Sequence, residues 1–198
     1  YSFSNQPPIT KWNLTRFAEC LIPLIDKDED KAVKIATETI DNFQNIYETK
    51  WLNMMRDKLG LFGEEVNDKK LINNLLIWME NNKADYTNTF CHLMNTEINH
   101  NKVYEDNNFI NWSNEWKQRI LKNNNSKEKS IDLMKMSNPN VIPRNHKVEE
   151  ALNSANEGNL EILNKLLSVL KKPYSSQETI EDYQLPSTNN NYQTFCGT

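Results

Sequence analysis

Residues 32–60 read AVKIATETIDNFQNIYETKWLNMMRDKLG, and this stretch decides the fold class. Its apolar residues recur every three or four positions, from Ala32 through Trp51 to Leu59. That spacing places them on one face of an α-helix, whereas a half-buried strand would alternate with a period of two. Gly60 follows the last apolar residue, where glycine commonly ends a helix in the left-handed conformation. The stretch therefore predicts a long amphipathic helix that stops at Gly60.

The same helical spacing recurs on both sides of this stretch. Asp85 or Thr87 is expected to cap the helix that covers residues 90–98, because short polar side chains bond the first free backbone N–H groups of a helix. Pro23 is expected to bend the first helix or end it early. The further apolar stripes that predict helices cover residues 12–25, 71–79, 90–98, 109–121, 133–136, 148–155 and 160–170.

Gly158 and Asn159 separate the last two stripes. Glycine is a common helix stop and asparagine a common helix start, so these two helices are expected to form an antiparallel hairpin. No stretch of useful length alternates as a strand would. We therefore expect an all-α fold, a helical bundle of about eight helices over residues 1–172. Residues 173–198 are expected to form an extended polar tail.

The composition excludes several classes of function. The 198 residues carry a net charge of −4, so neither nucleic acid nor a membrane is an expected partner. Four glycines are few for a phosphate-binding loop, and no apolar run reaches the length of a membrane span. The three cysteines show no metal-ligand spacing, and their odd number favours a reducing cytoplasm over a disulfide scaffold.

Three acidic residues, Glu64, Glu65 and Asp68, lie close together in the sequence around a glycine. Carboxylates in a cluster can bind a hard cation, but the spacing of a calcium loop is not present. We interpret them as a solvated loop whose negative charge favours the N-terminus of the next helix. The residues themselves therefore predict no metal site.

Cys91 and His92 are adjacent, as a nucleophile and its base could be. Neighbouring residues of a helix point about 100° apart, so this pair is not expected to act in catalysis. We interpret Cys91 as a core cysteine beside a surface histidine, and Cys20 as a second core cysteine. The tryptophans all fall within apolar stripes, which favours core packing over a stacking platform. They are Trp12, Trp51, Trp78, Trp112 and Trp116.

Four strings of the sequence resemble motifs of the SelO (YdiU) family, in the same order and with the same spacing. The resemblance covers the chain from Tyr1 to Thr198. The strings are YSFSNQPPITKWNLTRFAECLIPLI (1–25), MRDKLGLFGEE (55–65), LINNLLIWMENNKADYTNTFCHL (71–93) and SNPNVIPRNHKVEEALNSANEGNLEILNKLLSVLKKPY (137–174).

The resemblance implies a protein-kinase-like fold and a pseudokinase that transfers AMP from ATP to Ser, Thr or Tyr hydroxyls of protein substrates, with magnesium or manganese. In the family, the nucleotide-binding lysines, the base-like Asp-Asn pair and the metal-binding Asp all precede the NQP signature, where this chain begins. No catalytic, cofactor-binding or metal-binding residue is therefore carried over. The chain is expected to be a non-catalytic C-terminal fragment, the end of the kinase-like C-lobe plus a helical extension.

Other functions stay open at this point. The chain could be an independent all-α protein-interaction module, while the missing catalytic groups argue against an enzyme acting alone. The expected partner of the fragment is the upstream kinase-like lobe of the same protein. If such a lobe is missing, apolar surface should be exposed, and a dimer through that surface is expected.

Cys196, third from the end of the chain, matches the position of a terminal cysteine or selenocysteine in the family. The resemblance implies a redox switch whose partner cysteine lies upstream, although this chain ends CGT where the family has CSS. Cys91 also departs from the pattern, since the family has arginine there. Four residues match the family's polar positions and are interpreted as caps and buried hydrogen bonds between helices, with a contact to the active lobe as the alternative. They are Arg16, Asp85, Arg144 and Asn145.

Overall fold

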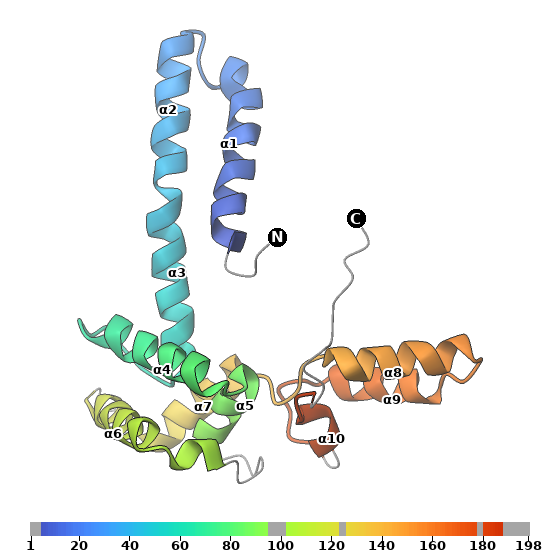
Figure 1. Cartoon of the computed structure of the whole chain (residues 1–198). Coiled ribbons are helices and arrows are strands. Elements are labelled where there is room, and N and C mark those ends of the chain that lie inside the picture. The colour runs from blue at the N-terminus through green and yellow to red at the C-terminus, as the bar shows by residue number, and fades with distance from the viewer. Residues whose placement is uncertain (1–4, 95–101, 123–125, 178–179, 188–198) are drawn as a thin grey trace. The chain divides into compact units, whose positions relative to one another are not determined.

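The computed structural model describes residues 5–94, 102–122, 126–177 and 180–187 (Figure 1). Its regular elements over these ranges are all helices, which confirms the all-α prediction. The chain divides into two compact units, Tyr1–Met54 and Met55–Thr198. The elements are α1 (Gln6–Ile25), α2 (Glu29–Asp41), α3 (Phe43–Lys58), α4 (Asp68–Asn82), α5 (Tyr86–Leu93), the 3-10 helix η2 (Lys102–Glu105), α6 (Asn107–Leu121), α7 (Lys127–Ser137), α8 (Asn145–Asn156), α9 (Glu161–Leu170) and α10 (Glu181–Gln184).

In the first unit, α1 runs antiparallel to α2, and the beginning of α3 continues almost in line with α2 (Figure 1). The prediction of a single long helix up to Gly60 is therefore wrong, because the helix is interrupted at Asn42. Asp and Asn side chains compete for backbone hydrogen bonds, which weakens a helix where Asp41 meets Asn42. Pro23 lies inside α1, and the helix ends two residues later, at Ile25.

The α1 helix buries none of its side chains in the first unit. Trp12 is 56% exposed and Phe17 60% exposed, and Cys20 is exposed as well. The core positions predicted for Trp12 and Cys20 are therefore wrong. The helical spacing had identified an apolar face correctly, but a face is buried only where a partner covers it.

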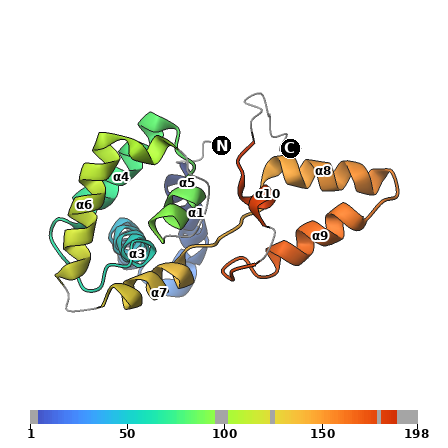
Figure 2. The same ribbon diagram turned by 90° about the horizontal axis from the view of Figure 1, so that it is seen from below.

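The core of the second unit lies around the C-terminal end of α3, where α4, α5, α6 and α7 surround it (Figure 2). Trp78, Trp112 and Trp116 are buried there, as predicted. Each indole N–H has a partner: Trp112 donates to the Leu71 carbonyl and Trp116 to the Leu59 carbonyl, both at 2.8 Å. Buried indoles need such acceptors, so these bonds select one packing of the core.

Gly60 ends α3 as predicted, with φ at +66°. Its N–H donates to the Asp57 carbonyl at 3.0 Å, and the next N–H, that of Leu61, donates to the Arg56 carbonyl at 2.9 Å. Such bonds satisfy the carbonyls that a helix end leaves free. The turn sends the chain into the loop that precedes α4.

The α8 and α9 helices form the predicted antiparallel hairpin, which Figure 2 shows with the two helices side by side. Gly158 lies between them with φ at +88°. The Asn159 side chain accepts a hydrogen bond from the Glu161 N–H at 2.9 Å, so it caps α9 from one position further out than expected. Among the described helices, none is both long enough and apolar enough to cross a bilayer.

Part of the segment expected as an extended tail is packed instead. Residues 180–187 include the short α10. Ile180, just before this helix, is 6% exposed, and Tyr183, within it, is 9% exposed. Both side chains join a core cluster with Val141, Ala151 and other residues of the hairpin. The polar composition of 173–198 concealed these two anchors, because they are single apolar residues without a stripe.

Candidate functional site

Asp85 and Arg144 form the most extensive polar contact between residues of the family motifs. Asp85 precedes α5 and caps it, since its Oδ1 accepts from the Asn88 N–H at 2.8 Å. Arg144 precedes α8 and donates to both Asp85 oxygens, from Nη1 at 2.6 Å and from Nη2 at 2.9 Å. A guanidinium that bridges both oxygens of a carboxylate is held in one orientation. The pair therefore fixes the start of α5 to the start of α8.

The same guanidinium joins a third segment. Arg144 Nη2 donates to the Gln184 carbonyl at 2.8 Å and to Asn88 Oδ1 at 3.2 Å. Asn88 Nδ2 also donates to the Gln184 carbonyl, at 3.1 Å. This agrees with the interpretation of Asp85 and Arg144 as structural residues, because the bonds join α5, α8 and the end of α10.

Arg16, interpreted in the same way from the sequence, does not join helices within its unit. Its Nη2 pairs with Glu19 of the same helix at 2.6 Å, and its guanidinium lies 5.7 Å from the centre of the Trp12 ring. The side chain is half exposed. The prediction of a buried bond between helices is therefore wrong for Arg16. Asn145 is the first residue of α8.

Arg144→Lys is expected to lower the free energy of unfolding by about 1.5–3 kcal/mol. Lysine keeps the charge but cannot bridge two carboxylate oxygens and a carbonyl at once. Urea unfolding measures the loss, and Arg16→Lys on the exposed helix is the matched control, expected to change stability by less than about 0.5 kcal/mol. Equal effects of the two substitutions would contradict the structural role of Arg144.

A second charged cluster surrounds Asp68, which is 1% exposed. Its carboxylate accepts from Arg56 Nε at 2.8 Å, from Arg119 Nε at 2.6 Å and from the Glu65 N–H at 3.0 Å. Arg119 also donates to the Phe62 carbonyl at 3.2 Å. The predicted solvated acidic loop is therefore wrong for Asp68, whose burial is made possible by two arginines.

Sequence reasoning missed Arg56 and Arg119. Each is less than a tenth exposed, although arginine is among the residues most often found at the surface. The available signal was their position on the apolar side of α3 and α6, beside Met55 and Ile120. Burial of Asp68 raises its pKa, but hydrogen bonds from Arg119, the Glu65 N–H and Arg56 lower it more, so the pKa lies below its usual value.

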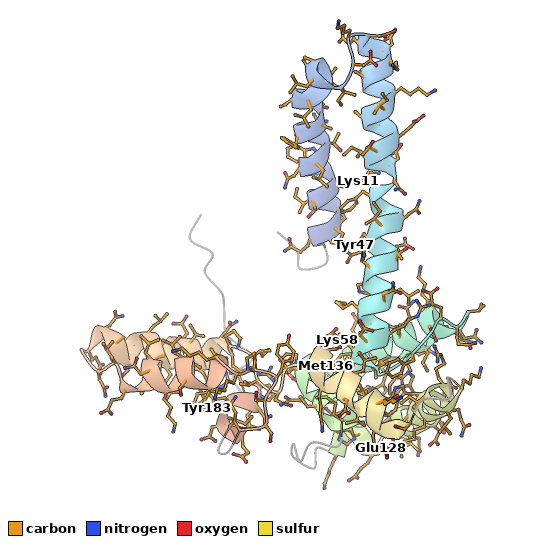
Figure 3. All side chains as sticks on the ribbon, turned by 180° about the vertical axis from the view of Figure 1, so that it is seen from behind. Lys11, Tyr47, Lys58, Glu128, Met136 and Tyr183 are labelled. Carbon is orange, nitrogen blue, oxygen red and sulfur yellow. The ribbon has the colours of Figure 1, made fainter. Side chains whose placement is uncertain are left out.

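Cys91 is completely buried, as predicted, and its Sγ donates to the Pro139 carbonyl at 3.5 Å. Burial, with the nearby charge of Asp85, raises the pKa of this thiol to about 11. The thiolate is the reactive form of cysteine, so Cys91 is a weak nucleophile at neutral pH. Lys58 is labelled in Figure 3. Its ammonium lies 4.4 Å from the centre of the ring of Phe90, which belongs to the same helix as Cys91.

His92 is not the surface residue that the sequence predicted. Its ring stacks on Tyr104 with the two ring centres 3.9 Å apart, and burial lowers its pKa. Within the described residues, no three His, Cys, Asp or Glu side chains gather as a metal site would need. Cys196, the redox candidate, lies outside the described residues.

Comparison with known families gives these positions a context. Residues 1–171 match the sequence model of a family described as Protein adenylyltransferase SelO. The chain belongs to the SelO family. Asp85 and Arg144, at the junction of α5, α8 and α10, lie within the residues that this family model matches.

Relatives with the name Protein nucleotidyltransferase YdiU are similar to the whole chain. One from Pelagibacter ubique is 56% identical over 202 residues, and one from Alkaliphilus metalliredigens is 45% identical over 201. One from Clostridium beijerinckii is 45% identical over 200 residues. Each alignment covers all of this chain and 41% of the relative. The chain thus spans about two-fifths of the length of these SelO-family proteins.

Proposed function

We propose that this chain is the non-catalytic, helical C-terminal region of a SelO-type protein adenylyltransferase. One observation carries the proposal: polar residues of the family motifs, Asp85 and Arg144, are engaged in ion pairs and hydrogen bonds that join helices. Side chains engaged in this way position elements of a fold, which favours a structural role over a catalytic one. The 41% of the relatives' length that this chain spans supports the assignment to one region of a larger protein.

The whole protein, in this proposal, transfers AMP from ATP to Ser, Thr or Tyr hydroxyls of other proteins with magnesium or manganese. The residues for that reaction belong to a kinase-like lobe outside residues 1–198. The role of this chain is to support the lobe. The exposed apolar side chains of α1, among them Trp12 and Phe17, fit this role, because a face of that kind is stabilised when another part of the protein covers it.

The proposal is tested by an AMP-transfer assay with mass spectrometry. This chain and a version extended upstream are incubated with ATP and magnesium or manganese, with a protein mixture as acceptor. We expect an added AMP group only with the longer protein. Modification by this chain alone would place the catalytic residues within 1–198 and overturn the proposal. Size-exclusion chromatography of the same samples shows whether the uncovered α1 surface pairs two copies of the short chain.

We further propose that Cys196 regulates the longer protein through its redox state. In the reducing cytoplasm, where we place the protein, the Cys196 thiol stays reduced. Under oxidising conditions it can form a disulfide with a cysteine of the lobe, while a small-molecule disulfide takes up the two electrons and two protons and is reduced to thiols. The buried Cys91 is a poor alternative, because its raised pKa keeps it protonated.

Cys196→Ser in the longer protein is expected to remove the difference in AMP transfer between oxidising and reducing conditions. Cys20→Ser is the control, because Cys20 is the exposed cysteine of α1 and should leave that difference intact. The proposal of redox control fails if the parent protein has the same activity under both conditions, or if Cys20→Ser has the effect expected of Cys196→Ser.

A further inference from the structure

Residues 180–185 contact the α8–α9 hairpin as a bound peptide would contact its receptor, and not as the continuation of a neighbouring helix would. Two apolar side chains, Ile180 and Tyr183, enter the hydrophobic cluster of the α8–α9 hairpin, and Figure 3 shows Tyr183 where α10 meets the hairpin. The anchors are three positions apart, the spacing of one face of a helix. Peptides that dock as helices present such anchors to a groove.

The surface under these anchors is apolar. Its apolar lining comes from the segment before α8 and from both helices of the hairpin. Lys147 of α8 also places its ammonium 5.8 Å from the centre of the Tyr183 ring. The buried residues of this lining are Val141, Ala151, Leu166 and Val169.

Polar contacts at one end of the groove capture the backbone of the segment. Arg144 Nη2 and Asn88 Nδ2 both donate to the Gln184 carbonyl, at 2.8 and 3.1 Å. The Gln184 side chain donates to the Asn140 carbonyl at 2.9 Å. Because these two donors bond a main-chain carbonyl, they would bind a peptide with any residue at that position. The side-chain amide of Gln184 adds a preference for glutamine.

Among the described residues, the segment 180–185 contacts the apolar lining of the hairpin together with Asn88, Asn140 and Arg144. α10 is four residues long, and a helix of that length is unstable in isolation because nucleation is costly. The preceding chain is fastened separately, since Gln177 Nε2 donates to the Val169 carbonyl at 3.1 Å and to the Lys172 carbonyl at 2.9 Å. Docking of residues 180–185 is thus a local event that can reverse while the hairpin stays folded.

We propose that the α8–α9 hairpin, with Asn88, Asn140 and Arg144, forms a binding site for a short helical peptide, and that residues 180–185 of this chain are its displaceable occupant. The ligand class is a peptide with an aliphatic residue three positions before a tyrosine, followed by glutamine. Because Arg144 also holds Asp85 at the start of α5, release of the segment is transmitted to α5. This inference does not depend on the proposed AMP transfer.

The experiment uses the full chain with a protease site inserted between Gln177 and Glu178. After cleavage, the piece that carries residues 180–185 is held only by the groove. We expect the nicked protein to keep its circular dichroism spectrum, to lose the piece on dilution, and to bind a fluorescent peptide of residues 178–187 in its place. Tyr183→Ala in the peptide should weaken binding roughly 30-fold, as loss of a buried aromatic anchor does.

Asp182→Ala in the peptide is the matched control, because Asp182 is exposed in α10 and should not change the affinity. The inference is overturned if the piece leaves only when the hairpin unfolds, or if Tyr183→Ala and Asp182→Ala peptides bind equally well. Hydrogen exchange on the uncut chain gives an independent check. The amides of Tyr183 and Gln184 should exchange faster than those of α8 and α9, and equal rates would show that the segment is an integral part of the core.

Discussion

Asp68→Asn is expected to lower the free energy of unfolding of the Met55–Thr198 unit by about 3–5 kcal/mol. The substitution keeps the shape of the side chain and removes its charge. Arg119 then remains buried without its carboxylate, and Arg56 loses its ion pair with Asp68 while it keeps the one with Glu64 at 3.3 Å. An uncompensated buried charge is far costlier than a lost surface ion pair. Urea unfolding followed by circular dichroism measures the loss.

Asp57→Asn is the matched control for this prediction, because Asp57 is an exposed carboxylate on α3, next to the buried Arg56. Its removal should change stability by no more than about 0.5 kcal/mol. A similar small change for Asp68→Asn would show that the two arginines do not depend on Asp68 and would contradict the role given to the cluster.

The same cluster predicts a pH dependence. The pKa of Asp68 in the folded protein lies below its ordinary value of 3.8, so its contribution to stability is present above that value and is lost as the pH falls through the lowered pKa. Asn cannot titrate. The difference in stability between the parent and Asp68→Asn should therefore be constant near neutral pH and shrink below pH 3.8. A difference independent of pH would mean that the charge of Asp68 is not what stabilises the fold.

Gly60→Ala is expected to cost about 2–5 kcal/mol, the sum of two separate penalties. A φ of +66° is unfavourable for any residue with a Cβ. A Cβ at this position would also lie 2.6 Å from the backbone oxygen of Ser130 and 3.0 Å from Met134 Cγ. Because the closer atom belongs to the α7 backbone, relief requires α7 to move away from the end of α3.

Gly158→Ala separates the two penalties. Gly158 has a φ of +88°, but a Cβ there would have no atom within 4 Å. Its substitution should cost only the conformational term, about 1–2 kcal/mol. Thermal or urea unfolding of both variants makes the comparison, and equal losses would show that the close approach of α7 to Gly60 does not contribute.

Local signals in the sequence predicted much of the secondary structure. Gly60 and Gly158 stop helices as expected, and Asp85 caps α5, because each of these effects acts over four residues or fewer. The break at Asn42 was missed, since the apolar stripe of 32–60 continues across it. Periodicity reports which face of a chain is apolar, and it does not report small interruptions of the backbone.

The burial of single residues was harder to predict. Trp12 and Trp112 both lie in apolar stripes, yet Trp12 is 56% exposed and Trp112 only 5%. The difference depends on whether another segment covers the stripe, and that segment can lie far away in the chain. Ile180 and Tyr183 show the converse case, since they are buried although no stripe surrounds them.

The sequence by itself determined the all-α class, several helix ends and the resemblance to the SelO family, because these depend on residue types at short spacings. Only the tertiary structure decided that Asp68 is a buried ion-pair partner and not part of a solvated loop. Its two arginines lie 12 and 51 residues away in the sequence. A carboxylate is stable in a protein interior only where opposite charges and hydrogen-bond donors meet it, and the folding of α3, α4 and α6 together brings them to one point.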